Sequence, residues 1–165
     1  MKKSLKIFGT DYDGVIINIE SQKAKTFGKL INDKWGIKQE DAAQYWVESG
    51  GKSRRYKFEH LYKNQFHREL SDKEYVSIES KYSELLESKY YSKIKLLPGA
   101  LELLNFVRSC FDYTFVSSGM PMEQIKKLVK LNKVANYFDL VLGTDMRYLS
   151  KREHFRKIIK EKNRA

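Results

Sequence analysis

The sequence predicts an α/β protein with a parallel, Rossmann-like sheet and an inserted helical segment. Three short apolar runs, at residues 5–10, 113–116 and 139–142, are typical of buried strands. The stretch from residue 21 to 91 has apolar residues at helical spacing, and helical patterns also follow the second and third runs. Because strands alternate with helices in the core segments, we expect a parallel sheet with right-handed crossovers.

The chain of 165 residues suits one core with an inserted subdomain. We expect residues 1–19 and 93–165 to form the α/β core, and residues 20–92 to form an all-helical insertion. The insertion contains several helices separated by one clear break at residues 48–53, which include two consecutive glycines. Ser71 and Glu74 have the spacing of a capping box, which predicts the start of a helix.

The second part of the core shows the same alternation. A Leu-Pro-Gly turn precedes a predicted helix over residues 100–109, and the strand at 113–116 ends in two serines. Pro121 suits the first turn of the next helix. Ser150 and Glu153 form a second capping box before the last helix. Ligands of such sheets bind at the carboxyl ends of the strands, so we expect a functional site at that end.

The net charge of +11 admits nucleic acid, anionic membranes or small anions as partners. The lysines are scattered, however, and no zinc-finger spacing or RNA-recognition signature is present, so a nucleic-acid site is disfavoured. Cys110 is the one cysteine, which excludes an intramolecular disulfide and favours a packing role for this thiol. No apolar run reaches the roughly 18 residues of a membrane helix, so we expect a cytoplasmic protein without a membrane partner.

Asp11 and Asp13 are the most informative residues. They directly follow the first strand, with Gly14 after them to allow a turn. Two carboxylates that converge there can divide the work of phosphoryl transfer: one attacks phosphorus, the other moves a proton, and a divalent cation lies beside them. The alternative is a strand that ends in an ordinary polar turn. Ser117 and the loop before Lys151 fall at the same end of the sheet.

The order of these motifs resembles that of the haloacid dehalogenase superfamily of phosphohydrolases. Residues 7–16 are similar to its first motif, a hydrophobic strand followed by Asp-x-Asp-Gly. Residues 115–119 are similar to its second motif, a strand that ends in Ser or Thr, and Lys151 lies where the third-motif lysine is found. The helical insertion resembles the family's small C1-type cap, so the resemblance spans nearly the whole chain.

The resemblance implies a role for each matched residue. Asp11 is implied as the nucleophile that forms an aspartyl-phosphate, and Asp13 as the general acid and then the base. Ser117 and Ser118 are implied to bind the phosphoryl group, and Lys151 to neutralise its charge. The implied cofactor is Mg²⁺, held by Asp11 and by the backbone carbonyl of Asp13, since this hard ion prefers oxygen ligands.

Several of these residues also have a plain structural explanation. A serine that ends a strand is a helix-cap candidate, and Lys151 could be a solvated lysine, although a cation in the first turn of a helix is slightly unfavourable. Lys52 and Arg54 follow the Gly-Gly break, where the family's cap loop touches substrate, but a plain helix connection explains them equally well. The three histidines lack metal-ligand spacing and are expected at the surface or in helix packing; they are His60, His67 and His154.

The family's fourth motif, an acidic cluster at the end of a further strand, has no counterpart in this sequence. The core is therefore expected to be C-terminally incomplete, with one carboxylate ligand fewer for the metal. The strand at 5–10 is expected to have a bare edge, which invites self-association. Asp145 is an alternative metal ligand. Three interpretations stay open: a fragment of a longer product, a sheet completed by a second chain, or a binding protein that has lost catalysis.

The leading functional hypothesis is a Mg²⁺-dependent phosphatase that acts on a small phosphorylated metabolite through an aspartyl-phosphate. A sugar-phosphate mutase is a close neighbour of this hypothesis. The alternative from another class is a truncated or catalytically impaired binding or assembly protein, which the missing fourth motif supports. A nucleic-acid binder is supported by net charge alone.

Overall fold

The computed structural model describes residues 5–144 and 150–162, and the chain divides into two compact units. Unit 1, the core, comprises Met1–Asn18 and Ile94–Ala165, and unit 2, the cap, comprises Ile19–Lys93. The division expected from the sequence has its boundaries after residues 19 and 92. Asp145, considered as a metal ligand, lies outside the described residues.

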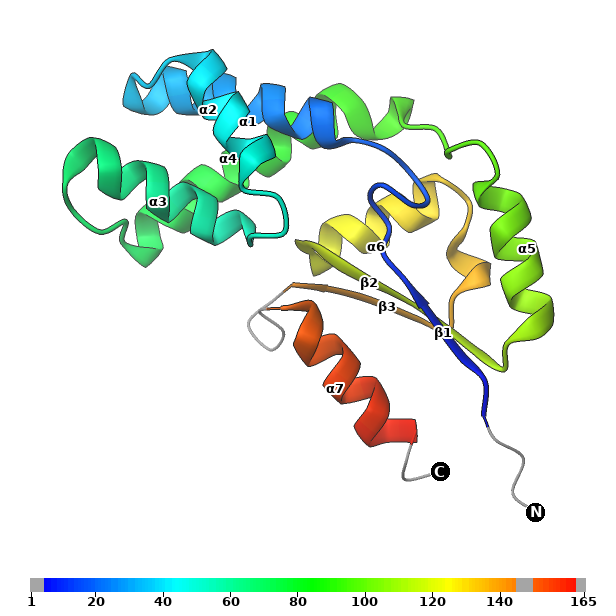
Figure 1. The fold of residues 1–165 in the computed structure, drawn as a ribbon. Coiled ribbons are helices and arrows are strands. Elements are labelled where there is room, and N and C mark those ends of the chain that lie inside the picture. The colour runs from blue at the N-terminus through cyan, green and yellow to red at the C-terminus, as the bar shows by residue number, and fades with distance from the viewer. Residues whose placement is uncertain (1–4, 145–149, 163–165) are drawn as a thin grey trace. The chain divides into compact units, whose positions relative to one another are not determined.

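The core is built on a parallel sheet, as the sequence predicts. Its strands are β1 (Ile7–Thr10), β2 (Tyr113–Pro121) and β3 (Leu140–Thr144), in the order β1-β2-β3 (Figure 1). β2 is longer than predicted, because the backbone stays extended through an irregularity between Ser117 and Pro121. Pro121, expected in the first turn of a helix, is instead the last residue of β2 and the N-cap of α6, which starts one residue later.

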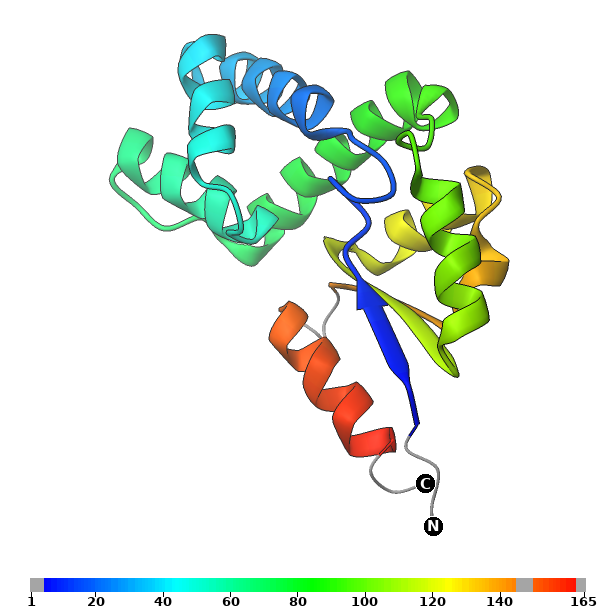
Figure 2. The same ribbon diagram turned by 45° about the vertical axis from the view of Figure 1, so that its right-hand side comes forward.

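Helices cover both faces of this sheet. They are α5 (Ala100–Cys110), α6 (Met122–Leu131) and α7 (Lys151–Lys162), with a short 3₁₀ helix, η2 (Ala135–Tyr137), before β3. In the core, α5 and α6 lie on one side of the sheet and α7 on the other (Figures 1 and 2). Phe115, Leu142 and Ile158 form the buried cluster between the sheet and α7. Cys110, expected to be packed, ends α5 in an exposed position, because the inward side of that helix is formed by Leu104 and Val107.

β1 lies at the end of the strand order, so among the described residues no strand pairs with its outer side. The bare edge expected from the sequence is thus present in this part of the chain. An unpaired strand edge exposes a row of backbone donors and acceptors to any other extended chain. Self-association through this edge stays a prediction.

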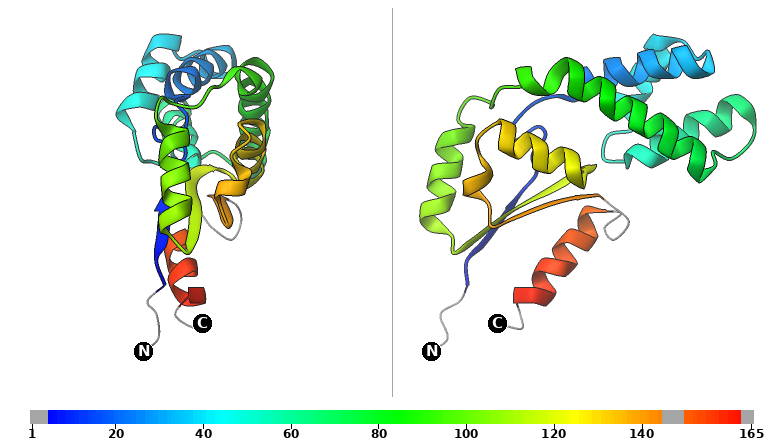
Figure 3. Two further views of the ribbon diagram at one scale, coloured as in Figure 1. Left: turned by 90° about the vertical axis from the view of Figure 1, so that its right-hand side faces the viewer. Right: turned by 180° about the vertical axis from the view of Figure 1, so that it is seen from behind.

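The cap consists of four α-helices: α1 (Glu20–Trp35), α2 (Gln39–Glu48), α3 (Arg54–Phe66) and α4 (Asp72–Tyr90), followed by the 3₁₀ helix η1 (Tyr91–Lys93). Within this unit α1 packs against α2 and α4 (Figure 3). The capping box predicted for α4 is confirmed: the Glu74 amide donates to Ser71 Oγ at 3.3 Å, and the Ser71 amide donates to Glu74 Oε2 at 3.0 Å. The break predicted at 48–53 separates α2 from α3.

Aromatic rings form the centre of the cap. Phe27 is fully buried, with ring centroids of Trp46 at 4.9 Å, Phe58 at 5.0 Å and Tyr82 at 6.1 Å. These three neighbours come from α2, α3 and α4, so one side chain of α1 contacts every other α-helix of the unit. Burial of such large rings is the main favourable term for a helical unit of this size.

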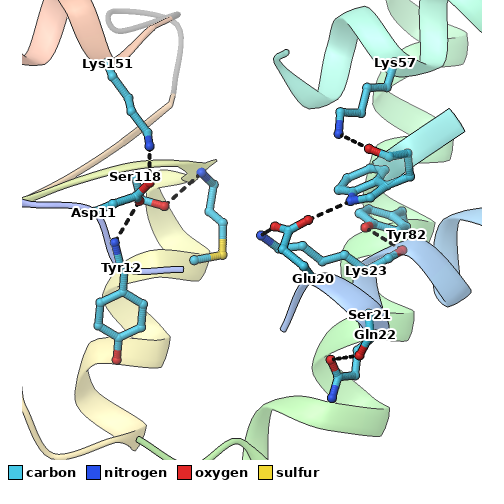
Figure 4. A network of polar contacts seen from close by, with 12 residues as sticks. Asp11, Tyr12, Glu20, Ser21, Gln22, Lys23, Lys57, Tyr82, Ser118 and Lys151 are labelled. Carbon is cyan, nitrogen blue, oxygen red and sulfur yellow. Dashed lines mark hydrogen bonds and ion pairs between the residues drawn. The ribbon is translucent and has the colours of Figure 1, made fainter. Parts of the chain in front are cut away.

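A lysine is also buried in the cap. Lys57 of α3 is 4 % exposed, its Nζ donates to the Trp46 carbonyl at 2.8 Å, and it lies 4.0 Å from the Trp46 ring centroid (Figure 4). Trp46 Nε1 in turn donates to Glu20 Oε2 at 3.0 Å. Burial lowers the pKa of Lys57 to about 8, with nearby Lys23 and Arg54 adding to the effect and Glu20 opposing it.

Replacing Lys57 by Met is expected to change how stability depends on pH. Below pH about 8 the lysine is protonated in both states, so the folded state includes the full penalty of a buried charge. Between about 8 and its ordinary pKa of 10.5 the unfolded chain binds more protons, so wild-type stability gains from rising pH. The Lys57→Met variant lacks this gain.

The measurement is urea unfolding of both proteins at several pH values from neutral to alkaline. Lys29→Met, an exposed change on α1, is the control and is expected to follow the wild type. Taking differences between variants cancels the opposite contribution of partly buried tyrosines such as Tyr75, whose pKa is raised to about 12 by desolvation. If stability changes with pH in the same way in wild type and Lys57→Met, the lowered pKa of Lys57 is contradicted.

A search of the described helices for a segment long and apolar enough to cross a bilayer finds none.

Candidate active site

Asp11 is the first residue after β1, and the backbone there is shaped so that the next side chain turns inward. Tyr12 is fully buried, and its hydroxyl donates to Asn132 Oδ1 at 2.9 Å. Burial raises the pKa of the Tyr12 phenol well above its ordinary value. With Tyr12 in the core, Asp11 and Asp13 on either side of it are both half-buried at the carboxyl end of β1.

A tight loop holds Asp13 in place. Gly14 has a φ of 80°, a left-handed conformation that favours glycine. Its amide donates to the Ile17 carbonyl at 2.7 Å, and the Ile16 amide donates back to the Tyr12 carbonyl at 2.8 Å. The Leu97 amide then donates to the Ile16 carbonyl at 2.9 Å, which fixes the loop to the segment before α5. The glycine that the sequence marks as a turn residue has that role.

Lys151 contacts Asp11 although the two residues are 140 positions apart in the sequence. Its Nζ forms an ion pair with Asp11 Oδ2, while Asp11 Oδ1 accepts a hydrogen bond from the Tyr12 amide at 2.8 Å (Figure 4). Lys151 is the first residue of α7, where Glu153 Oε2 accepts from the Ser150 amide at 2.8 Å, half of the predicted capping box. The structure thus brings the implied nucleophile and the implied cation into direct contact.

A second contact between the sheet and α7 joins Ser117 to His154. Ser117 Oγ lies 2.9 Å from His154 Nδ1, and His154 Nε2 lies 2.9 Å from the Gly143 carbonyl oxygen. Ser117 is 3 % exposed and His154 is 0 % exposed. His154, expected at the surface or in helix packing, is buried beside a motif serine, a position that the sequence did not indicate. Its spacing of one helical turn from Lys151 is too common a pattern to mark it in the sequence.

The strand register places these two contacts side by side. Thr10 of β1 is paired with Val116 of β2, so Asp11 and Ser117 occupy the next positions on neighbouring parallel strands. Adjacent strands lie about 4.8 Å apart, and paired positions have their side chains on the same side. Both residues therefore face α7, where their partners Lys151 and His154 are one turn apart.

Ser118, the other implied phosphate ligand, is 1 % exposed, and its Oγ accepts a hydrogen bond from the Met120 amide at 3.1 Å (Figure 4). This bond supports the extended end of β2. The phosphate-binding role of Ser117 and Ser118 stays a prediction.

The cap residues Lys52 and Arg54 differ in their surroundings within unit 2. Lys52 is exposed, with its Nζ 5.2 Å from the Tyr56 ring centroid. Arg54 is 7 % exposed, its Nη1 donates to Glu79 Oε1 at 2.5 Å and to Ser83 Oγ at 3.0 Å, and its guanidinium lies over the Tyr82 ring. Arg54 therefore has a structural role in joining α3 to α4, and substrate contact by either residue stays a prediction.

The donor set near β1 suits a hard cation in part. Asp11 and Asp13 supply carboxylate oxygens, and Mg²⁺ is commonly bound by one or two carboxylates together with water and substrate phosphate oxygens. Among the residues that the structure describes, no group of three or more His, Cys, Asp or Glu side chains is arranged to hold a metal. A site built from these two acids would therefore be completed by other oxygen ligands, such as the Asp13 backbone carbonyl, water and substrate phosphate oxygens.

Known structures resemble this chain over nearly its whole length. A haloacid dehalogenase-like family hydrolase from Streptococcus pneumoniae matches with a TM-score of 0.72 and 16% identity, over 96% of this chain and 70% of that one. A predicted phosphatase from Clostridium acetobutylicum matches with a TM-score of 0.75 and 20% identity, over 97% and 72%. A mutant of CbbY from Rhodobacter sphaeroides, in complex with xylulose-(1,5)bisphosphate, matches with a TM-score of 0.69 and 15% identity, over 97% and 73%.

No protein-family model and no curated protein sequence matches the chain. The structural matches nevertheless agree in type, and several are described as phosphatases or as hydrolases of this family. At these identities they show the fold. The protein has the haloacid dehalogenase-like, phosphatase-type fold: a Rossmann-like parallel sheet with an inserted helical cap, as predicted from the motifs.

Proposed function

We propose that the protein is a phosphohydrolase that cleaves a small phosphorylated metabolite through an aspartyl-phosphate at Asp11. The observation on which this rests is the ion pair of Asp11 with Lys151 at the carboxyl end of β1, in a fold whose similar structures include named phosphatases. A carboxylate held beside an ammonium group, where phosphate ligands bind in such sheets, suits attack on phosphorus.

In the proposed reaction an Asp11 oxygen attacks phosphorus as the bond to the leaving oxygen breaks. Asp13 gives its proton to that oxygen, so that an alcohol leaves and an aspartyl-phosphate remains. Asp13 then takes a proton from water, whose oxygen attacks phosphorus and releases inorganic phosphate and free Asp11. Lys151 stabilises the negative charge on the transferring group throughout, which is a mainly electrostatic contribution.

Asp11 and Asp13 are the residues that would hold Mg²⁺ in this proposal, the latter through its backbone carbonyl. When bound, the ion supplies positive charge that polarises the phosphoryl oxygens. The small number of carboxylates among the described residues is an argument for modest metal affinity.

The substrate class is proposed from size and charge. We propose a small phosphate ester of sugar size. This choice is supported by the solved CbbY complex with xylulose-(1,5)bisphosphate and by a β-phosphoglucomutase-like structure from Thermotoga maritima. Exposed Lys52 in the cap is the proposed contact for the rest of the anion.

A second proposal is a catalytically impaired binding protein with the same fold. The observation that favours it is the lack of a third acidic metal ligand in the described segments. Such a protein would still bind phosphate through Lys151 and the strand ends, but would not turn substrate over.

The experiment that separates these proposals is hydrolysis of p-nitrophenyl phosphate by the purified chain. We expect turnover with Mg²⁺, loss of turnover after chelation with EDTA, and recovery when Mg²⁺ is added back in excess. Turnover that EDTA leaves unchanged would contradict the metal requirement. Phosphate binding without any turnover would contradict the phosphohydrolase and support the binding protein.

A further inference from the structure

We infer that His154 is a positioning residue that controls the direction of the Ser117 hydroxyl at the phosphoryl site. This inference rests on the proposed function, because it assumes that a phosphoryl group binds beside Asp11. It depends on the chain of contacts from the Gly143 carbonyl through the buried imidazole to Ser117 Oγ, with both hydrogen-bond lengths at 2.9 Å.

The chemistry of the three groups determines which atom donates. A carbonyl oxygen can only accept, so His154 Nε2 must carry a hydrogen and donate to Gly143. In a neutral imidazole, Nδ1 is then left as an acceptor, and Ser117 donates its hydroxyl hydrogen to it. In the imidazolium form both ring nitrogens donate, and the Ser117 hydrogen becomes free to point elsewhere.

Because of where the imidazole lies, the direction of the Ser117 hydroxyl affects how a phosphoryl group can bind. Ser117 lies at the strand position beside Asp11, and His154 lies one helical turn from Lys151, the partner of Asp11. A phosphoryl group bound at Asp11 therefore lies on the side of the sheet to which Ser117 points. To donate to a phosphoryl oxygen, the Ser117 hydroxyl must break its hydrogen bond to a neutral His154 Nδ1. Alternatively, Ser117 Oγ accepts a hydrogen bond from Nδ1 of the imidazolium form, which leaves the hydroxyl hydrogen available for the phosphoryl oxygen.

Charged side chains among the described residues also flank the imidazole. On α7 they are Lys151, already paired with Asp11 of β1, and Lys157, which forms an ion pair with Glu161 at 3.4 Å. From β2 and β3, the imidazole has the neutral Ser117 hydroxyl and the Gly143 carbonyl as hydrogen-bond partners. His154 is thus in direct contact with Ser117 and can respond to a change in the direction of its hydroxyl.

Two substitutions separate the two hydrogen bonds of His154. Asn places a side-chain amide near the position of Nδ1 and can keep a contact with Ser117. Gln extends its amide toward the position of Nε2 and can keep the contact with Gly143. Both remove the imidazole and create a similar packing defect, so a purely structural role predicts equal effects.

The test combines kinetics and NMR on the full chain. In p-nitrophenyl phosphate hydrolysis we expect His154→Gln to lower kcat/KM at least tenfold more than His154→Asn. In a Ser117→Ala background this difference is expected to vanish, because the group on which His154 acts is gone. Equal losses in the two His154 variants, or an unchanged difference without Ser117, overturn the inference while leaving the phosphohydrolase in place.

Imidazole ¹⁵N spectra supply a readout that does not need turnover. We expect the Nδ1 signal of His154 to move when inorganic phosphate is added, and not to move in Ser117→Ala, with His60 and exposed His67 as internal references. A wild type without turnover whose His154 signal moves overturns the proposed function alone. A His154 signal that phosphate leaves unchanged overturns the positioning role.

Discussion

Replacing Asp11 by Asn is expected to lower p-nitrophenyl phosphate turnover on the order of 10³-fold or more. The amide is a poor nucleophile and cannot form an aspartyl-phosphate, and loss of a nucleophile is among the largest single-residue effects in enzymes. Asn is nearly the same size and can still accept the hydrogen bond from the Tyr12 amide, so the loop is expected to keep its shape. Loss of the carboxylate also leaves Lys151 without its anionic partner at this position.

A matched control is Asp112, which directly precedes β2 at the opposite end of the sheet. Asp112 accepts a hydrogen bond from the Lys6 amide at 2.9 Å, on the side where β1 begins. Asp112→Asn makes the same change in net charge, and we expect its turnover to stay within about twofold of the wild type, since it lies outside the proposed site. If Asp11→Asn keeps a tenth or more of the wild-type rate, the aspartyl-phosphate mechanism is wrong.

Replacing Phe27 by Ala is expected to destabilise the protein by about 3–5 kcal/mol, the range for truncation of a buried aromatic ring. Phe27 is fully buried at the point where α1 contacts Trp46, Phe58 and Tyr82. Truncation leaves a cavity among rings from three other helices, which cannot all move to fill it. Denaturant unfolding followed by tryptophan fluorescence is a suitable measurement, because Trp46 lies beside the lost ring.

Phe66 at the end of α3 is the control for this change. It is 41% exposed and contacts Tyr62 and Trp35 at the surface of the same unit. Phe66→Ala is expected to lower the free energy of unfolding by less than about 1.5 kcal/mol, since much of its surface already meets water. Equal losses for the two variants would show that the cap does not depend on Phe27 in the way its burial indicates.

Much of the fold could be predicted because its signals are local. Apolar runs gave the three strands, the Ser71–Glu74 spacing gave the start of α4, and the Gly-Gly stretch gave the break between α2 and α3. The prediction around Pro121 failed for a tertiary reason. Proline suits the first turn of a helix, but here the pairing of Pro121 with Thr144 of β3 extends the strand through it.

The site was predictable where a motif marks a residue and unpredictable where only the fold makes the contact. The pairing of Asp11 with Lys151 could be expected from the order of the motifs. The contact of His154 with Ser117 could not, because a single histidine one turn into a helix has no distinctive pattern. Arg54 shows the converse: its place after the cap loop left substrate contact and a plain helix connection equally open, and the folded cap buries it against Glu79 and Tyr82.

Among the described residues no strand covers the outer side of β1, and this edge gives the high positive charge of the chain an expected effect on association. Extended backbone without a partner is a template for growth into larger aggregates. A charge of +11 makes two copies repel each other before such edges meet, most strongly in dilute buffer where ions do not mask it. The scattered lysines are therefore expected to oppose association through this edge.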